Sequence, residues 1–152
     1  MGDRDRLDST DAQFVDIIHT AGHWVGSQIA TGHIDFYPNK GAAPQPGCEG
    51  SESLDLSCSH FQAWKLYLLS VDRIADRSLP PMLGIKCASH GAFMAGQCCN
   101  QDSEFAELGE VVDSRARGIF YLSTGPPPDR VLPVNIATNC KLASDHLPGL
   151  LH

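Results

Sequence analysis

Six cysteines in a chain of 152 residues constrain the fold more than any other feature of this sequence. Such a count indicates either disulfides formed in an oxidising compartment or a metal site. A tetrahedral zinc site usually takes close pairs of the C-x-x-C type, and the sequence has none. The adjacent Cys98 and Cys99 suit neither a disulfide with each other nor a shared chelate. We therefore favour disulfides over zinc.

Charge and hydropathy argue against a nucleic-acid partner and against a membrane-spanning segment. The formal net charge is −7 and the 11 Lys and Arg residues are spread along the chain, whereas nucleic-acid binding draws on clustered positive charge. No apolar run approaches the roughly 20 residues that cross a bilayer. The charged start, residues 1–6, differs from an apolar signal peptide. A secreted, disulfide-bonded protein is then expected only if its amino-terminal part is missing from this chain.

Three short segments rich in β-branched and aromatic residues predict strands at residues 14–19, 32–37 and 118–123. Residues 42–57 are rich in Pro, Gly and Ser, which predicts an irregular loop. Strands that alternate with helical or loop segments predict the α/β class rather than an all-β sandwich. Residues 126–152 are punctuated by proline without a clear period, and we expect a tail of uncertain order there.

One helix is predicted to start at His60. Ser59 and Gln62 have the spacing of a capping box, in which two side chains satisfy the free N–H groups of a helix start. Apolar residues then follow at helical spacing, which predicts a buried amphipathic helix. They are Phe61, Trp64, Leu68 and Val71, with Leu66 and Tyr67 widening the stripe. The cysteine-bearing segment 87–99 is predicted to be a loop.

Three motifs follow one another in the first third of the chain. They are Arg6-Leu-Asp-Ser-Thr-Asp-Ala-Gln-Phe-Val-Asp-Ile-Ile-His-Thr20, Gly32-His-Ile-Asp-Phe-Tyr-Pro-Asn39 and Gln45-Pro-Gly-Cys48. In this order they closely resemble the pancreatic lipase family. The resemblance continues through Cys58-Ser-His60 and Lys86-Cys-Ala-Ser89 to Phe120-Tyr-Leu-Ser-Thr-Gly125, so it covers roughly residues 3–125.

The resemblance implies an incomplete α/β-hydrolase fold: residues 1–125 would form the carboxyl-terminal part of the central sheet with the histidine-bearing helix. The family hydrolyses lipid esters with a Ser-His-Asp triad, whose serine lies in Gly-x-Ser-x-Gly and whose acid follows in Gly-Leu-Asp-Pro. Neither motif occurs in the 152 residues. Truncation of a longer product would explain both absences, and the chain alone is then expected to be inactive.

His60 matches the catalytic histidine of the family, which takes the serine proton and returns it to the leaving alcohol. The other histidines are expected to be structural, as for His19 and His33, or are assigned no role. A secreted carboxylic ester hydrolase of the lipase or phospholipase type is the first interpretation. A non-catalytic lipid-binding or yolk-protein-like relative is the alternative, and a free-standing disulfide-rich binding module is a third and less favoured one.

Four residues match the calcium-binding loop of the family: Asp3, Arg6, Asp8 and Asp11. Asp8 and Asp11 would bind through carboxylates, and Arg6 and Asp3 through main-chain carbonyls, which suits a hard cation. Without the resemblance, a solvated acidic loop would be the preferred interpretation of these residues.

The resemblance also implies the pairs Cys48–Cys58 and Cys87–Cys98, and it leaves Cys99 either paired with Cys140 or free. Cys48 and Cys58 bracket the segment that forms the lid of family members. The segment is short here, so the site should stay open to substrate, which favours esters of polar lipids.

Overall fold

The computed structural model describes residues 6–49 and 56–125 of the chain. Along the sequence it contains β1 (Asp16–Ile18), β2 (Ile34–Pro38), the 3-10 turn η2 (Asn39–Gly41), α1 (Leu56–Ala75), β3 (Leu83–Lys86), α2 (His90–Met94), β4 (Phe105–Glu107) and β5 (Gly118–Leu122). The three predicted strands correspond to β1, β2 and β5, each within the predicted range or one residue beyond it. The predicted tail, residues 126–152, lies outside the described residues.

The described strands form one mixed sheet in the order β1-β2-β5-β3-β4. β2 lies between β1 and β5 and runs parallel to both. β3 runs antiparallel to both β5 and β4. The carboxyl ends of three adjacent strands therefore lie at one edge of the sheet. This edge is where the chain can bring together residues that follow different strands.

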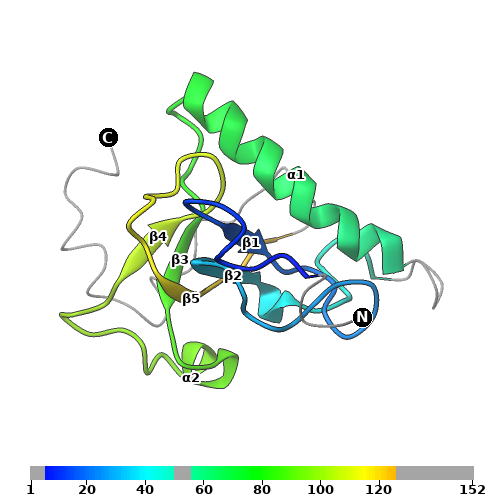
Figure 1. The fold of residues 1–152 in the computed structure, drawn as a ribbon, viewed down its shortest axis with the longest axis horizontal. Helices are drawn as coiled ribbons and strands as arrows, with labels where there is room; N and C mark the ends of the chain where they lie inside the picture. The colour runs from blue at the N-terminus through cyan, green and yellow to red at the C-terminus, as the bar shows by residue number, and fades with distance from the viewer. Residues whose placement is uncertain (1–5, 50–55, 126–152) are drawn as a thin grey trace.

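Successive side chains of β2 and β5 point to opposite faces of the sheet, so a hydrophobic cluster lies on each face. Phe36 and Phe120 pack with Leu66 of α1, and their ring centroids lie 5.8 Å apart. The intervening Tyr37 and Tyr121 point to the other face and pack with residues of α2. Figure 1 shows α1 and α2 on opposite sides of the sheet. A mixed sheet with a helix on each face confirms the α/β class.

The predicted loop 87–99 contains the short helix α2, and strands β3 and β4 were not predicted. Ser89 caps α2, since its side chain accepts a hydrogen bond from the N–H of Ala92 at 3.1 Å. A serine at this position is a helix-start signal that the sequence does carry. β3 and β4 have four and three residues, too few for an alternating pattern to stand out.

The predicted capping box at the start of α1 is wrong. The helix already includes Leu56, so Ser59 and Gln62 lie inside it rather than at its start. Their side chains bind groups outside the helix: Ser59 accepts a hydrogen bond from the N–H of Gln45, and Gln62 donates one to the sulfur of Cys48. These two side chains therefore bind the 42–49 segment and do not cap the helix.

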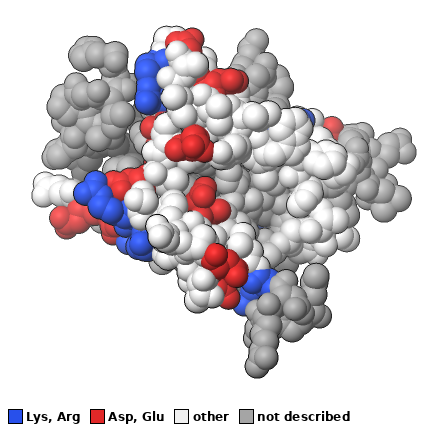
Figure 2. Space-filling view, turned by 45° about the horizontal axis from the view of Figure 1, so that its top comes forward, with Lys and Arg blue, Asp and Glu red and all other residues white. Residues whose placement is uncertain are grey.

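The prediction that the apolar stripe of α1 is buried is also wrong. Its large side chains are exposed, with Trp64 at 51% and Leu68 at 48%. The buried face of α1 instead carries Leu66 and four polar residues, namely Ser59, Gln62, Ser70 and Arg73. Periodicity identifies the apolar side of a helix but not what covers it. Figure 2 shows a broad uncharged area over the right-hand half of the face that it draws.

No helix in the described part of the chain is long and apolar enough to cross a membrane.

Two leucines of α1 provide a matched test of this orientation. Leu66 is 1% exposed in the core, and Leu68 lies two positions later on the open side. Leu66→Ala should lower the free energy of unfolding by about 2–5 kcal/mol, because it leaves a cavity. Leu68→Ala has the same effect on helix propensity and should cost less than about 1 kcal/mol. Urea unfolding of both variants measures the difference, and equal losses would contradict the orientation.

Candidate functional site around His60

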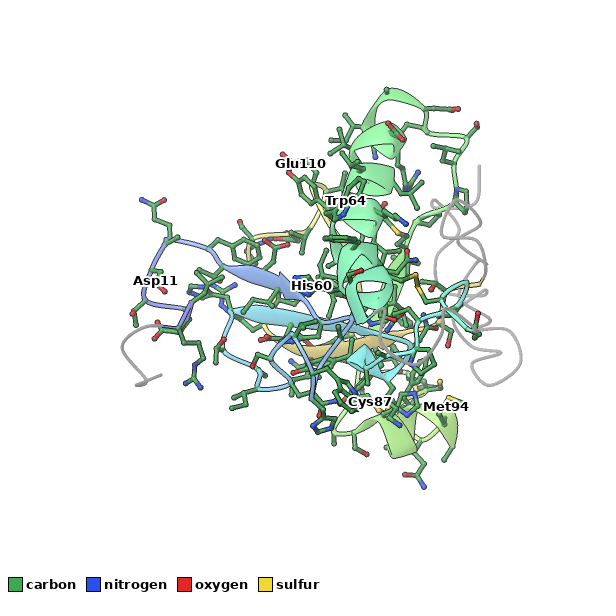
Figure 3. All side chains as sticks on the ribbon, turned by 90° about the vertical axis from the view of Figure 1, so that its right-hand side faces the viewer. Asp11, His60, Trp64, Cys87, Met94 and Glu110 are labelled. Carbon is green, nitrogen blue, oxygen red and sulfur yellow. A yellow bond between two sulfur atoms is a disulfide. The ribbon has the colours of Figure 1, made fainter. Side chains whose placement is uncertain are left out.

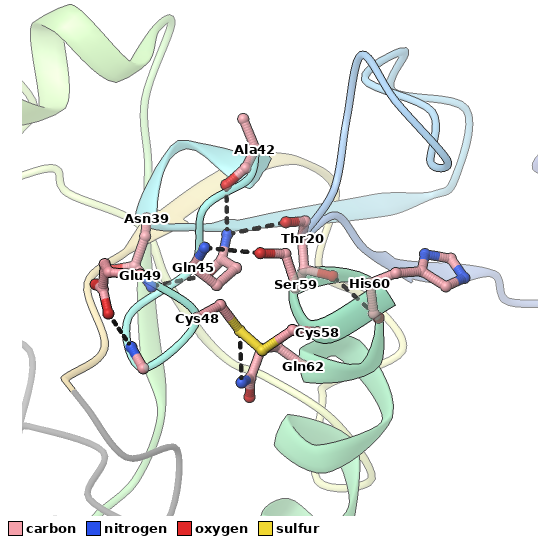
Figure 4. Close-up of a disulfide and its surroundings, with 11 residues drawn as sticks. Thr20, Asn39, Ala42, Gln45, Cys48, Glu49, Cys58, Ser59, His60 and Gln62 are labelled. Carbon is pink, nitrogen blue, oxygen red and sulfur yellow. Dashed lines mark hydrogen bonds between the residues drawn. A yellow bond between two sulfur atoms is a disulfide. The ribbon is translucent and has the colours of Figure 1, made fainter. Parts of the chain in front are cut away.

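His60 stands in α1 beside the carboxyl end of β1. The hydroxyl of Thr20, two residues after β1, donates to the main-chain carbonyl of His60 at 3.4 Å. The His60 side chain is exposed, and Figure 4 shows its ring pointing away from the buried residues around Thr20. The ring is thus presented to solvent at the edge where the parallel strands end.

A disulfide fastens the turn of α1 that carries His60. Cys48 and Cys58 are bonded, with their Cα atoms 5.8 Å apart, which confirms the first predicted pair. Gln62, one turn further along α1, donates to the Cys48 sulfur at 3.4 Å. Figure 4 shows both contacts beneath His60. The lid segment between the two cysteines falls mostly on residues 50–55, outside the described residues.

The ring of His60 has no hydrogen-bonded acid or hydroxyl among the residues that the structure describes. Its one ring neighbour there is Phe61, with centroids 6.3 Å apart. A histidine in this setting can accept or release a proton, but a nucleophile and an acid that orients the imidazole must come from elsewhere. A histidine so placed could therefore act as a general base only together with residues outside the described part of the chain.

His19 and His33 have the structural roles that were predicted for them. The Nε2 atom of His19 lies 2.8 Å from an oxygen of Asp35, and its Nδ1 atom lies 2.8 Å from the carbonyl oxygen of Ser27. Both members of the His19–Asp35 pair are buried, and His19 stacks on Tyr37 at 4.3 Å. His33 accepts a hydrogen bond from the N–H of Val15. Both histidines thus make hydrogen bonds that support the structure around β1 and β2.

Comparisons with known proteins agree with this arrangement. The profile of the Lipase family matches residues 2–126. The chain belongs to the lipase family. It is 40% identical over 101 residues to lipase member H-B of Xenopus laevis, covering 63% of this chain and 20% of that protein. It is 34% identical over 148 residues to pancreatic triacylglycerol lipase of Oryctolagus cuniculus, covering 79% and 30%.

A third relative of this lipase chain is phospholipase A1 member A of Rattus norvegicus, 38% identical over 97 residues, covering 62% of this chain and 20% of that protein. The chain spans between 20% and 30% of the length of these three relatives.

The loop predicted to bind calcium lies far from His60, as Figure 3 shows for Asp11. The main-chain N–H of Asp8 donates to the Asp11 carboxylate at 2.7 Å, which places this carboxylate against the main chain of Asp8. The pKa of Asp8 lies below its ordinary value, chiefly because the Thr10 hydroxyl and N–H donate to it, with a smaller effect of Arg6. Asp3 lies outside the described residues, within which no group of three metal-ligating side chains occurs.

The second predicted disulfide is also confirmed. Cys87 and Cys98 are bonded, with Cα atoms 5.5 Å apart, and close the segment that contains α2. Cys99 is disulfide-bonded as well, so the alternative of a free thiol is wrong. Its expected partner, Cys140, lies outside the described residues.

The buried His19–Asp35 pair leads to a stability prediction. Asp35 also accepts hydrogen bonds from the N–H groups of Thr31 and Gly32, so Asp35→Asn removes a partner from several buried donors. The free energy of unfolding should fall by on the order of 3 kcal/mol. Asp113→Asn is the matched control, because Asp113 pairs with Arg115 on the open surface and should leave the denaturation midpoint unchanged. Equal shifts in the two variants would contradict a special role for the pair.

Proposed function

We propose that this chain forms the carboxyl-terminal part of the catalytic domain of a lipase or phospholipase that hydrolyses carboxylic esters of lipids. His60 would be the general base of a Ser-His-Asp triad within an α/β-hydrolase fold. The serine and the acid would come from the part of the lipase that precedes these motifs. The observation that carries the proposal is the place of His60, exposed at the edge where three parallel strands end.

That edge is where chemistry is expected. In open α/β sheets, ligands bind outside the carboxyl ends of the parallel strands, where residues from several strands converge. A general base there must have an accessible ring and a fixed main chain. The exposed ring of His60 meets the first requirement, and the Cys48–Cys58 disulfide with the Thr20 contact meets the second.

The open side of α1 supports the view that this chain is one part of a larger domain. A helix in a globular protein normally buries its apolar face. Here that face carries Phe61, Trp64, Leu68, Val71 and Ile74, all of them more than a third exposed. Exposed apolar area of this kind marks a surface that another part of the protein covers. The remainder of the lipase would cover it and complete the site.

The substrate and the compartment form a further part of the proposal. Cys48 and Cys58 are only 10 positions apart, so the lid segment is short and would leave the acyl-binding cleft open to esters of polar lipids. The disulfides fit an oxidising, extracellular compartment. Hydrolysis of a phospholipid substrate compared with a triacylglycerol substrate, at equal surface concentration, tests the preference. Faster turnover of the triacylglycerol would reverse it.

A fusion experiment tests the catalytic proposal. The isolated chain should show no enzymatic turnover of p-nitrophenyl butyrate, because it has no positioned nucleophile or oxyanion hole. Fusion to an upstream lipase segment that carries Gly-x-Ser-x-Gly and Gly-Leu-Asp-Pro should restore solubility and turnover. His60→Ala in the fusion should then lower kcat by about 10⁴-fold or more.

His90→Ala provides the matched control for the fusion, because His90 lies in α2 on the opposite face of the sheet. It should retain turnover, and circular dichroism checks that both variants fold. Turnover by the isolated chain that depends on His60 would require a different nucleophile. A folded fusion that binds lipid without turnover would favour the carrier interpretation instead.

We also propose that Asp8 and Asp11 bind a structural calcium ion through carboxylates, with main-chain carbonyls of Arg6 and Asp3. The Asp11 carboxylate accepts a hydrogen bond from the Asp8 N–H, so the two residues lie next to each other, and carboxylate and carbonyl oxygens suit calcium. Calcium should raise the melting temperature of the fusion, because an ion that binds only the folded state stabilises it. The rise should disappear in Asp8→Ala/Asp11→Ala. An equal rise in the wild type and the double variant would remove the site.

A further inference from the structure

Gln45 lies at the centre of a buried polar cluster beneath His60. Its side chain is 1% exposed, and its amide nitrogen Nε2 lies within hydrogen-bond distance of three main-chain carbonyls. These belong to Pro38 at 3.0 Å, Ala42 at 3.0 Å and Thr20 at 3.2 Å. Its Oε1 atom accepts from the side chain of Asn39 at 2.9 Å. Figure 4 shows the bonds to Thr20, Ala42 and Asn39 converging on this amide.

These bonds join the ends of all three parallel strands. Pro38 ends β2, and Thr20 follows β1 by two residues. Asn39 adds the third strand, because its side chain donates to the Thr124 hydroxyl at 2.6 Å and accepts from the Thr124 N–H at 2.8 Å, just beyond β5. The amide of Gln45 therefore connects the loops that leave β1 and β2 directly, and the loop that leaves β5 through Asn39.

Gln45 also binds two residues that hold the main chain at His60, namely Ser59 and Thr20. Its main-chain N–H donates to the hydroxyl of Ser59 at 2.9 Å, and Ser59 precedes His60 in α1. On the other side, the Thr20 residue whose carbonyl faces the Gln45 amide donates its hydroxyl to the main chain of His60. The position of the His60 main chain relative to the strand ends thus depends on residues that Gln45 holds.

The turn after β2 needs such support. Asn39 and Lys40 both have positive φ angles, 50° and 78°, in the left-handed region that costs energy for residues with a side chain. Such conformations persist when surrounding contacts over-determine them. The contacts here are the two bonds of Asn39 to Thr124 and its bond to Gln45. An apolar residue at position 45 would leave buried carbonyls without a donor.

We propose that Gln45 is a positioning residue for His60: its buried amide sets where the His60 turn of α1 stands relative to the carboxyl ends of β1, β2 and β5. This inference rests on the proposed role of His60 as general base. Catalytic groups must be held within about 0.5 Å of their productive geometry, and a misplacement of 1 Å can cost about 100-fold in rate. A contact that never touches substrate can thus control turnover.

The first test uses NMR on the lipase fusion with isotopically labelled histidine. The ring resonance of His60 is assigned by its disappearance in His60→Ala. Gln45→Leu should shift or broaden this resonance, because the His60 turn is no longer fixed. Gln97→Leu is the matched control, since Gln97 is exposed, and it should leave the resonance unchanged. An unchanged His60 resonance in a folded Gln45→Leu fusion would overturn the proposal.

The second test uses the lipase fusion and separates kcat from KM on a soluble ester. Gln45→Leu should lower kcat by about tenfold and leave KM within about twofold, since binding does not require the base. Should Gln45→Leu not fold, Ser59→Ala removes only the bond from the Gln45 main chain and favours helix, and kcat should still fall several-fold. Unchanged kcat in the folded variants would overturn the proposal.

A double variant distinguishes positioning from a general structural effect. In the His60→Ala background, Gln45→Leu should cause no further loss of kcat, because its effect acts through His60. A tenfold loss that persists without His60 would overturn the inference about Gln45. Failure of the proposed function has a different signature, namely full turnover by His60→Ala itself.

Discussion

The main constraint on this molecule is that buried main-chain groups at the ends of three parallel strands must find hydrogen-bond partners. Strands β1, β2 and β5 satisfy one another along their length, but their hydrogen bonding stops where the loops begin. The carbonyls of Thr20 and Ala42 lie beyond the paired strands and that of Pro38 lies at the end of β2, and all three residues are buried. Unpaired carbonyls there would cost free energy comparable to lost hydrogen bonds. The amide nitrogen of one glutamine, supplied by a loop of irregular structure, lies within hydrogen-bond distance of all three.

The parallel strands were predictable from sequence because their signal is local. β2 and β5 are rich in aromatic and large aliphatic residues, which favour strands. β3 and β4 carry no such signal, since they are short and gain their strand geometry from pairing with β5 and with each other. Local propensity therefore predicted the centre of the sheet, and tertiary pairing decided its antiparallel edge.

The candidate site was predicted unevenly for a similar reason. His60 and the two disulfides followed from family motifs, and the structure places His60 at the strand ends and confirms both bonds. Gln45 lies in one of the family motifs, but no role was predicted for it, because that role depends on carbonyls that come from distant parts of the chain. A lone glutamine in a segment rich in Pro and Gly predicts only a loop. The role of its buried side chain can be inferred only when the relative positions of β1 and β2 are known.

The orientation of helix α1 also depends on contacts with distant segments of the chain. Its inner face is largely polar because it serves loops: Ser70 accepts a hydrogen bond from the N–H of Glu110, and Arg73 donates to the carbonyl of Leu79. These contacts fix the helix to the sheet with only Leu66 fully buried among its described apolar side chains. The apolar stripe is therefore free to face the other way.

A helix with polar contacts to its own loops and an apolar outer face is suited to lie between two parts of one domain. The inner contacts hold it to this chain, and its outer face provides the hydrophobic area that a second part would bury. His60 lies near one end of this helix, so the same element that would join the two parts also carries the proposed catalytic base. Completion of the core and completion of the triad would then be a single event, because the segment that covers α1 would also bring the nucleophile to His60.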